Sequence, residues 1–259
     1  MKIKAAVVDK VNDPFVIKDD IELAEMKATD LQIKMVATGI CHSDEAIRRG
    51  DASLGYPVIL GHEGSGIVEK VGSEVTNFEV GDHVILSFYA DGTCDNCLKG
   101  MPTKCRNYAD YNLSGTRPDG SDHFQENGHH ISDMFDQSSF TTHTVVDQRN
   151  AVKVPKELDL RRLGPLGCGY VTGSGTVLNS LQPRPGQTIA VFGTGAVGLA
   201  AMMTGLCIPR VLARSPILLM TPGPKKLTLG IKKSKLRSVI LITSFYIVIA
   251  IITNLRIKL

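Results

Sequence analysis

Hydrophobic and polar residues alternate in short runs along the first 150 residues of the chain, and turn residues separate these runs. The clearest runs are KAAVVD (4–9), LQIKMVATGI (31–40), GSGIVEKVG (64–72) and DHVILSFY (82–89). Turn signals lie between them at Asn12-Asp13-Pro14, Gly55-Tyr56-Pro57 and Val80-Gly81-Asp82. Apolar runs of this kind, bounded by Gly, Pro and Asn, predict strands. We therefore expect a β-rich barrel or sandwich in this part of the chain.

The pattern changes after residue 160. The apolar spacing in GPLGCGYVTGSGTVLNSL (164–181) permits a helix, although its many glycines lower the helical propensity. TIAVF (188–192) is typical of a buried strand, and AVGLAAMM (196–203) of a helix that follows it. The turn between them, Gly193-x-Gly195-x-x-Gly198, has the pattern in which backbone N–H groups and a helix N-terminus face a dinucleotide pyrophosphate. The alternative is a glycine-rich turn that only allows close packing of helix on strand.

The chain changes character after Thr204. Ten Lys and Arg and no acid follow this residue, whereas all 26 acids precede it. The carboxylate that would bind the ribose of NAD, expected about 20 residues after the glycine turn, is therefore absent. Prolines interrupt the region where helices and strands should alternate, at Pro209, Pro216, Pro222 and Pro224. We expect the dinucleotide-binding fold to be incomplete, because it needs several more strands.

Composition and the segments at both ends of the sequence indicate where the protein is expected to be located and which partners are expected. The content of 43% apolar and 21% charged residues is typical of a soluble globular protein, and we expect no nucleic-acid partner. The N-terminus lacks the apolar core of a signal peptide, so we expect a cytoplasmic location and cysteines that are not in disulfides. The uncharged run Ser238–Leu255 is shorter than the about 20 residues of a membrane span, and a membrane anchor is the less favoured alternative.

One group of potential metal ligands is close together in the sequence. Cys94, Cys97 and Cys105 have the spacing C-x2-C-x7-C, and three thiolates can converge on one tetrahedral zinc ion. Asp91, three residues before Cys94, could supply an oxygen as the fourth ligand. The alternative is three unrelated loop cysteines and a turn aspartate.

A second group of potential ligands is spread along the chain and consists of Cys41, His62 and Cys168. Two cysteines and one histidine leave one zinc coordination position open for water or an alcohol oxygen, which is the arrangement of a catalytic site. Taken singly, Cys168 could be a small buried residue and His62 a hydrogen-bonded polar group. Spacing alone does not bring the three together.

The contexts of these residues resemble a known family. Gly61-His62-Glu63-x2-Gly66-x5-Gly72-x2-Val75 is similar to the signature of the zinc-containing alcohol dehydrogenases of the medium-chain dehydrogenase/reductase family. GICHSD (39–44) resembles the first zinc-ligand motif of that family, and the cysteine cluster resembles its structural zinc lobe. The resemblance covers residues 1–203. SSFTTHTVV (138–146) and PLGCGYVTGSGTVLN (165–179) are similar to the aryl (benzyl-type) alcohol dehydrogenases.

The resemblance implies a role for each matching residue. Cys41, His62 and Cys168 would bind a catalytic Zn²⁺, and Asp91, Cys94, Cys97 and Cys105 a structural one, although Asp91 stands where a cysteine is most common. Glu63 would lie near the catalytic metal. Asp44 would orient His62, Ser43 would begin a proton relay, and His42 would face the cofactor or join that relay. The cofactor, NAD or NADP, would lie on Gly193, Gly195, Ala196, Val197 and Gly198.

One alternative to these roles remains. Ser43 and Asp44 could instead cap a helix that begins near Glu45, because Ser and Asp favour such positions. The other histidines match no ligand motif, and we expect them in turns or on the surface: His83, His123, His129, His130 and His143.

The resemblance implies a β-rich GroES-like catalytic domain (1–160), followed by a linker helix and the first strand, turn and helix of an incomplete α/β Rossmann domain (161–204). A basic and apolar tail of uncertain structure (205–259) is unrelated to the family. The implied activity is hydride transfer between a primary, aryl alcohol or aldehyde and NAD(P), with activity in doubt because the cofactor domain is incomplete. The alternative is a non-enzymatic remnant with a zinc-bound β domain, such as a reading-frame change near codon 204 would produce. The oligomeric state is left undefined.

Overall fold

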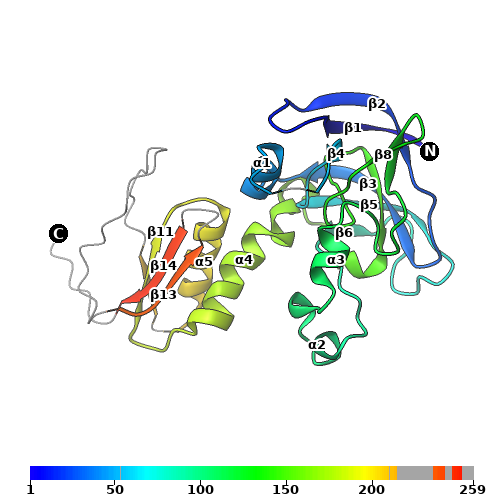
Figure 1. The fold of residues 1–259 in the computed structure, drawn as a ribbon. Helices are drawn as coiled ribbons and strands as arrows, with labels where there is room; N and C mark the ends of the chain where they lie inside the picture. The colour runs from blue at the N-terminus through cyan, green and yellow to red at the C-terminus, as the bar shows by residue number, and fades with distance from the viewer. Residues whose placement is uncertain (53, 210, 215–235, 243–246, 253–259) are drawn as a thin grey trace. The chain divides into compact units, whose positions relative to one another are not determined.

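The structure is a computed structural model that describes residues 1–52, 54–209, 211–214, 236–242 and 247–252. The chain divides into two compact units, Met1–Cys168 and Gly169–Leu259. The first unit is rich in strands, and the second combines helices with a small sheet (Figure 1).

Two antiparallel five-stranded sheets form the first unit. One has the order β4-β1-β2-β7-β8, with the strands β1 (Lys2–Val8), β2 (Val16–Leu23), β4 (Val58–Ile59), β7 (Phe124–Glu126) and β8 (His129–Ile131). The other has the order β10-β6-β5-β3-β9, with β3 (Asp30–Thr38), β5 (Gly64–Val71), β6 (His83–Leu86), β9 (His143–Asp147) and β10 (Ala151–Val154). The strands predicted from the four apolar runs correspond to β1, β3, β5 and β6, which confirms the β-rich unit.

The period of two along a strand explains how these sheets share a buried interior. Val145 and Val146 are neighbours on β9, and their side chains point to opposite faces. Val145 packs in the cluster that contains Ile3 and Phe124, whereas Val146 packs with Leu31. Each of these side chains is at most 3% exposed. Burial of one such apolar side chain stabilises the fold by ~1.5–3 kcal/mol.

Short helices connect the strands of the first unit. They are α1 (His42–Arg48), α2 (Asp95–Leu98), η1 (Pro102–Lys104), α3 (Tyr108–Asn112), η2 (Gln148–Asn150), η3 (Leu160–Arg162) and η4 (Gly164–Gly167). The helix α1 follows β3 directly, and α2 with η1 forms the loop that carries the cysteine cluster.

The second unit begins with α4 (Gly169–Gly175), which continues into η5 (Thr176–Leu181), wound as a π-helix. The predicted strand and helix are observed as β11 (Thr188–Phe192) and α5 (Ala196–Cys207), and β12 (Leu212–Arg214) pairs in parallel with β11. This strand–helix–strand unit has the connection expected of a parallel sheet. Apolar residues on β11, η5 and α5 form its core, among them Val177, Ile189 and Val197.

The other edge of β11 is occupied by a strand of opposite direction. β14 (Ile247–Ile252) pairs antiparallel with β11, and β13 (Leu236–Ile242) pairs antiparallel with β14. A doubly wound sheet would have a parallel strand on both sides of its first strand. The described residues therefore contain only the beginning of such a sheet, as expected.

The apolar run 238–255 is observed as parts of β13 and β14 where the structure describes it. Among the described residues, no helix is both long and apolar enough to cross a membrane. Pro216, Pro222 and Pro224 lie outside the described residues.

Candidate functional site

Cys41, His62 and Cys168 come together in the first unit. Cys41 precedes α1, His62 precedes β5, and Cys168 follows η4. One ligand atom from each residue lies within 4.8 Å of the other two, and the Cys41 and Cys168 Sγ atoms are 3.9 Å apart. Two sulfurs bound at 2.3 Å to one tetrahedral zinc ion would be about 3.8 Å apart. The geometry therefore fits a metal with three protein ligands and one open position.

Asp44 holds two of these three residues in position. Its Oδ1 lies 3.1 Å from His62 Nδ1 and accepts a hydrogen bond from the Gly61 N–H at 3.0 Å. Its Oδ2 accepts a hydrogen bond from the Cys41 N–H at 2.8 Å. Because His62 Nδ1 faces Asp44, Nε2 is the nitrogen left to bind a metal.

The helix next to this site begins at His42, earlier than the expected start near Glu45. Asp44 therefore lies in the first turn of α1 and its carboxylate binds the N–H of Cys41 just before the helix, so it serves the helix start as well as His62. His42 is exposed. The Ser43 hydroxyl lies 3.8 Å from Cys41 Sγ and is half-buried.

The pKa values of the three residues respond to one another. The hydrogen bond from Cys168 and the nearby His62 imidazole lower the pKa of Cys41, whereas the hydrogen bond to Cys41 and burial raise the pKa of Cys168. Burial disfavours the charged form of His62, but Asp44 and Cys41 outweigh this and raise its pKa to about 10. The site thus favours a thiolate at Cys41, the form of cysteine that binds metals.

Glycines allow the chain to approach Glu63, which is 4% exposed. A Cβ atom at Gly39 would collide with the Glu63 carboxylate, and one at Gly164 would collide with the Glu63 carbonyl oxygen. The Glu63 carboxylate also contributes to the raised pKa of Cys168. Close backbone packing therefore holds this carboxylate beside the ligand cluster.

Asp91, Cys94, Cys97 and Cys105 form a second cluster, on the loop that contains α2 and η1. One ligand atom from each lies within 4.8 Å of the others. Asp91 Oδ1 accepts hydrogen bonds from the N–H groups of Thr93 and Cys94 at 2.8 and 2.9 Å, and its Oδ2 lies 3.3 Å from Cys105 Sγ. Sulfur and oxygen ligands of one tetrahedral zinc ion would be about 3.5 Å apart. Asp91 can therefore fix the turn with one oxygen and serve as a ligand with the other.

Hydrogen bonds within this cluster also shift the pKa values of its residues. The N–H groups of Cys94 and Thr93 hold the pKa of Asp91 well below its usual range. Backbone N–H groups also lower the pKa of Cys94, and burial and the Cys94 thiol raise the pKa of Cys97 to about 12. The cluster thus contains a fixed carboxylate and one favoured thiolate.

The glycine turn of the second unit has the geometry of a tight strand-to-helix connection. Gly193 adopts φ +108°, and a Cβ atom at Gly198 would collide with the Gly193 carbonyl oxygen. Gly195 immediately precedes α5, whose first two residues are Ala196 and Val197. Nothing lies within 4 Å of a Cβ atom built at Gly195 among the described residues, so the turn has room for a ligand on that side.

The expectation that His123 lies in a turn or on the surface is wrong. His123 is fully buried, stacks on Phe124 with ring centroids 4.1 Å apart, and lies 2.9 Å from Asp133. It was missed because the residue directly precedes β7, where packing between elements decides burial. His129 and His130 are exposed, as expected, and His83 and His143 are half-buried.

The fold and the first cluster define the class of domain: a two-sheet β unit with a metal-type site of two cysteines and one histidine. A family model described as "Alcohol dehydrogenase GroES-like domain" matches residues 27–156, half of the chain. The chain belongs to the GroES-like alcohol dehydrogenase family of zinc-type enzymes.

Similar proteins extend this likeness beyond the region of the family model. Geraniol dehydrogenase of Castellaniella defragrans is 43% identical over 202 residues, 77% of this chain and 54% of that protein. The structure of an alcohol dehydrogenase zinc-binding domain protein from Burkholderia ambifaria is 38% identical, with a TM-score of 0.78, and benzyl alcohol dehydrogenase from Acinetobacter calcoaceticus is 36% identical, with a TM-score of 0.76. Each structural match covers 82% of this chain and 58% of the other. The chain thus spans little more than half the length of these proteins.

Proposed function

We propose that the first unit is the metal- and alcohol-binding part of a zinc-dependent alcohol dehydrogenase. The observation that carries the proposal is the group of Cys41, His62 and Cys168, with sulfurs 3.9 Å apart and a histidine oriented by a buried carboxylate. Two thiolates and one imidazole suit zinc, and three protein ligands leave a position for an alcohol or aldehyde oxygen. Bound zinc supplies Lewis-acid polarisation of that oxygen.

The residues around the ligands have separate tasks in this proposal. Asp44 keeps His62 in the tautomer and orientation that present Nε2 to the metal. Ser43 accepts the proton of the alcohol and passes it outward, because its hydroxyl lies beside Cys41 and is half-buried. His42 continues this relay or faces the cofactor. Glu63 is a negative charge held next to the thiolates.

The second cluster is proposed to hold a structural zinc ion through Asp91, Cys94, Cys97 and Cys105. Its loop consists of short helices, and a metal would hold these together where few apolar contacts do. We also propose a reducing compartment such as the cytoplasm, in which the cysteines of both clusters stay available as metal ligands.

The cofactor in this proposal is NAD or NADP, which supplies the nicotinamide that accepts the hydride. Its pyrophosphate would lie on the N–H groups of residues 195–198 at the start of α5. The substrate class is a small primary alcohol or aldehyde. An aryl substrate is supported by the likeness to benzyl alcohol dehydrogenase, although geraniol dehydrogenase is a similar relative.

A second candidate is a zinc-holding domain without turnover. It is favoured by one observation: β14 pairs antiparallel with β11, at the edge where a doubly wound sheet would place another parallel strand. Among the described residues, a cofactor site built on this turn lacks the further parallel strands that normally complete it.

Metal analysis and a rate measurement on the full chain test the two candidates. The proposal predicts zinc in both cysteine clusters, loss of one equivalent in Cys41→Ser, and zinc-dependent formation of NADH from benzyl alcohol and NAD. Zinc at both clusters with no NADH formation and no NAD binding would support the domain without turnover. Both candidates would be contradicted if the wild-type chain and Cys41→Ser contained the same amount of zinc.

A further inference from the structure

A third group of metal-type side chains lies in the first unit, apart from the two cysteine clusters. It consists of His123, Asp133 and Asp136, which are 0, 1 and 0% exposed. One nitrogen or oxygen atom from each lies within 4.8 Å of the others. His123 Nδ1 is 2.9 Å from Asp133 Oδ2 and 3.9 Å from Asp136 Oδ1. Both distances are below about 4.2 Å, the largest separation of two atoms each bound at ~2.1 Å to one metal ion.

Two carboxylate oxygens of this group lack a hydrogen-bond donor. Asp133 Oδ1 and Asp136 Oδ1 are buried and have no hydrogen-bond partner among the described residues. A buried carboxylate oxygen without a donor is strongly unfavourable, because it has lost its contacts with water. Such oxygens therefore indicate a missing cation or proton donor.

The charges near the group are also unbalanced. Asp30, Asp133 and Asp136 bring three buried carboxylates together with one buried guanidinium, that of Arg117. Arg117 Nη2 donates to Asp30 Oδ2 at 2.8 Å, whereas its Nε is 3.6 Å from Asp136 Oδ1, too far for a hydrogen bond. The guanidinium thus pairs mainly with Asp30. Burial and the neighbouring Asp133 raise the pKa of Asp136 well above its usual range, as expected of a buried carboxyl group without a full counter-charge, and a divalent cation would supply that charge.

The imidazole of His123 has two polar neighbours. Nδ1 lies 2.9 Å from Asp133 Oδ2, and Nε2 lies 3.4 Å from the Thr144 hydroxyl, which donates its own hydrogen to the Gln137 carbonyl oxygen at 2.6 Å. Without a metal, Nδ1–H donates to the Asp133 carboxylate. A metal ion would take the place of this proton, and Nε2–H would then donate to the Thr144 oxygen.

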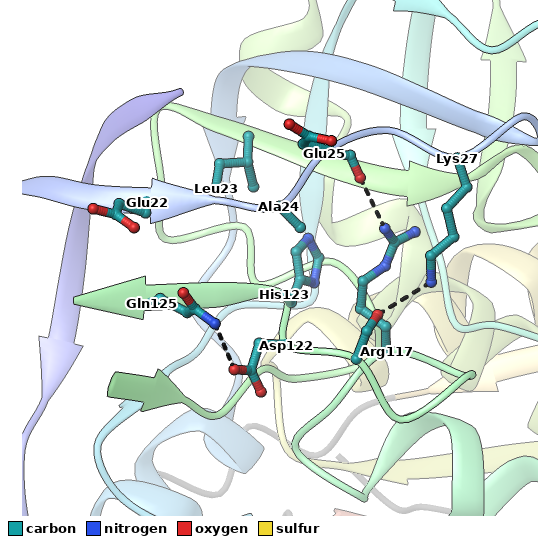
Figure 2. Close-up of a pocket in the computed structure, with 10 residues that line it drawn as sticks. Glu22, Leu23, Ala24, Glu25, Lys27, Arg117, Asp122, His123 and Gln125 are labelled. Carbon is teal, nitrogen blue, oxygen red and sulfur yellow. Dashed lines mark hydrogen bonds between the residues drawn. The ribbon is translucent and has the colours of Figure 1, made fainter. Parts of the chain in front are cut away.

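A surface cavity lies next to the group. His123 and Arg117 line a cavity of about 390 Å³ together with Lys27, Asp122 and Gln125 (Figure 2). In Figure 2 the His123 ring lies between the strand that bears Gln125 and the segment that bears Ala24. The cavity therefore brings solvent close to the residues that surround the imidazole, while the imidazole itself is fully buried.

We propose that His123, Asp133 and Asp136 bind a divalent metal ion that accepts one imidazole and two carboxylates, such as Mn²⁺ or Zn²⁺. The ion links the start of β7 to the segment 133–136. Phe135 in this segment packs edge-on against His62, with ring centroids 5.1 Å apart. The proposed ion is thus structural: it holds the segment 133–136, which packs next to the cluster of Cys41, His62 and Cys168.

Titration with Mn²⁺ of the full chain that carries only the two equivalents of zinc held by the cysteine clusters, followed by the loss of the electron paramagnetic resonance signal of free Mn²⁺, tests this proposal. Thiolate sites retain zinc, so Mn²⁺ reports on sites of nitrogen and oxygen ligands. We expect one Mn²⁺ per chain and at least a tenfold weaker affinity in Asp136→Asn. Asparagine tolerates the positive φ of +50° at this position, so the fold is retained. Asp122→Asn, in the same cavity wall, is the matched control and keeps the affinity.

Asp133→Asn gives a second test and should weaken Mn²⁺ binding to the same extent. Circular dichroism of each variant verifies its fold. The proposal is wrong if the wild-type chain binds no Mn²⁺, since a proton then fills the role of the ion. It is also wrong if both asparagine variants bind Mn²⁺ as tightly as the Asp122→Asn control. Neither result depends on whether the cysteine clusters support turnover.

Discussion

The carboxylate of Asp44 lies 3.1 Å from His62 Nδ1, and both side chains are 1% exposed. The second oxygen of the same carboxylate accepts a hydrogen bond from the Cys41 N–H. One side chain therefore orients one proposed metal ligand and fixes the backbone of another. The buried carboxylate is stabilised by both interactions, and it raises the pKa of His62.

Replacement of Asp44 by alanine should weaken zinc binding at the first cluster by ~10–100-fold, the usual effect of removing the group that orients a ligand. The affinity is measured by competition with a chromophoric chelator. Asp51→Ala, an exposed carboxylate shortly after the same helix, is the control and should bind zinc like the wild type. Equal zinc affinity in Asp44→Ala and Asp51→Ala would show that His62 does not need this orientation.

Asp91→Asn separates the two roles of Asp91. The amide oxygen still accepts the hydrogen bonds from Thr93 and Cys94 and so retains the turn, but the anionic ligand is lost. We expect at least ~10-fold weaker zinc binding at the second cluster and a lower melting temperature of the zinc-loaded chain. After zinc removal with a chelator, the two proteins should melt together. A difference that persists without zinc would assign the effect to the turn alone.

Two glycines of α4 should respond in opposite ways to the same substitution. A Cβ atom at Gly173 would collide with the Val197 carbonyl oxygen and lie 2.8 Å from the Ala200 Cβ, so Gly173→Ala should destabilise the second unit by ~1–3 kcal/mol. At Gly175 the nearest atom would be Asn179 Nδ2 at 3.7 Å. Gly175→Ala should therefore be neutral or stabilising by up to ~1 kcal/mol, because alanine favours helices.

Hydrogen exchange of the amides in residues 169–207 measures the effect of the two substitutions on the stability of the second unit. Faster exchange is expected in Gly173→Ala and unchanged or slower exchange in Gly175→Ala. Equal effects of both substitutions would indicate that α4 and α5 do not pack as closely as in the structure.

Asp82 should contribute a pH-dependent part of the stability. Burial disfavours its charge, but Lys153, 2.6 Å away, outweighs this and lowers the pKa of Asp82 below 3.8. A lowered folded-state pKa means that the stabilisation is complete above the unfolded pKa and is lost as the pH falls through the folded value. Lys153→Met removes the partner but keeps its packing.

We expect the wild type to exceed Lys153→Met in unfolding free energy by ~0.2–1 kcal/mol at pH 6, since Lys153 is partly exposed, and this difference should shrink below pH 4. Urea unfolding at several pH values measures it. Lys34→Met, an exposed change on β3, is the control and should show no such trend. A difference that is constant with pH would exclude Asp82 as its source.

Local sequence patterns were sufficient to predict the strands and helices that lie around the two cysteine clusters and the glycine turn. Alternating runs predicted β1, β3, β5 and β6, and the apolar run before the glycine turn predicted β11 with the correct ends. These predictions succeed because a strand or helix that buries one face leaves its period in the sequence. The start of α1 was placed three residues too late, because the carboxylate that caps it lies inside its first turn rather than before it.

Contacts between side chains from distant parts of the sequence were harder to predict. His123 was expected near the surface, yet it is enclosed by Phe124, Asp133 and Asp136, which belong to segments on either side of β8. The antiparallel pairing of β14 with β11 likewise has no local signal, since an apolar run of that length is compatible with a strand or a buried helix.

The sequence by itself determined which residue types are present and in what local context: two groups of cysteine and histidine ligands, the glycine turn, and the loss of all acids after Asp159. Tertiary structure alone decided that Cys41 and Cys168, 127 positions apart, bring their sulfurs to 3.9 Å, and that Asp44 serves both the helix start and His62. It also decided that His123 is buried between two carboxylates. The reason is physical: periodicity reports the face that an element buries, whereas distances between ligands and the burial of a charge depend on which elements pack together.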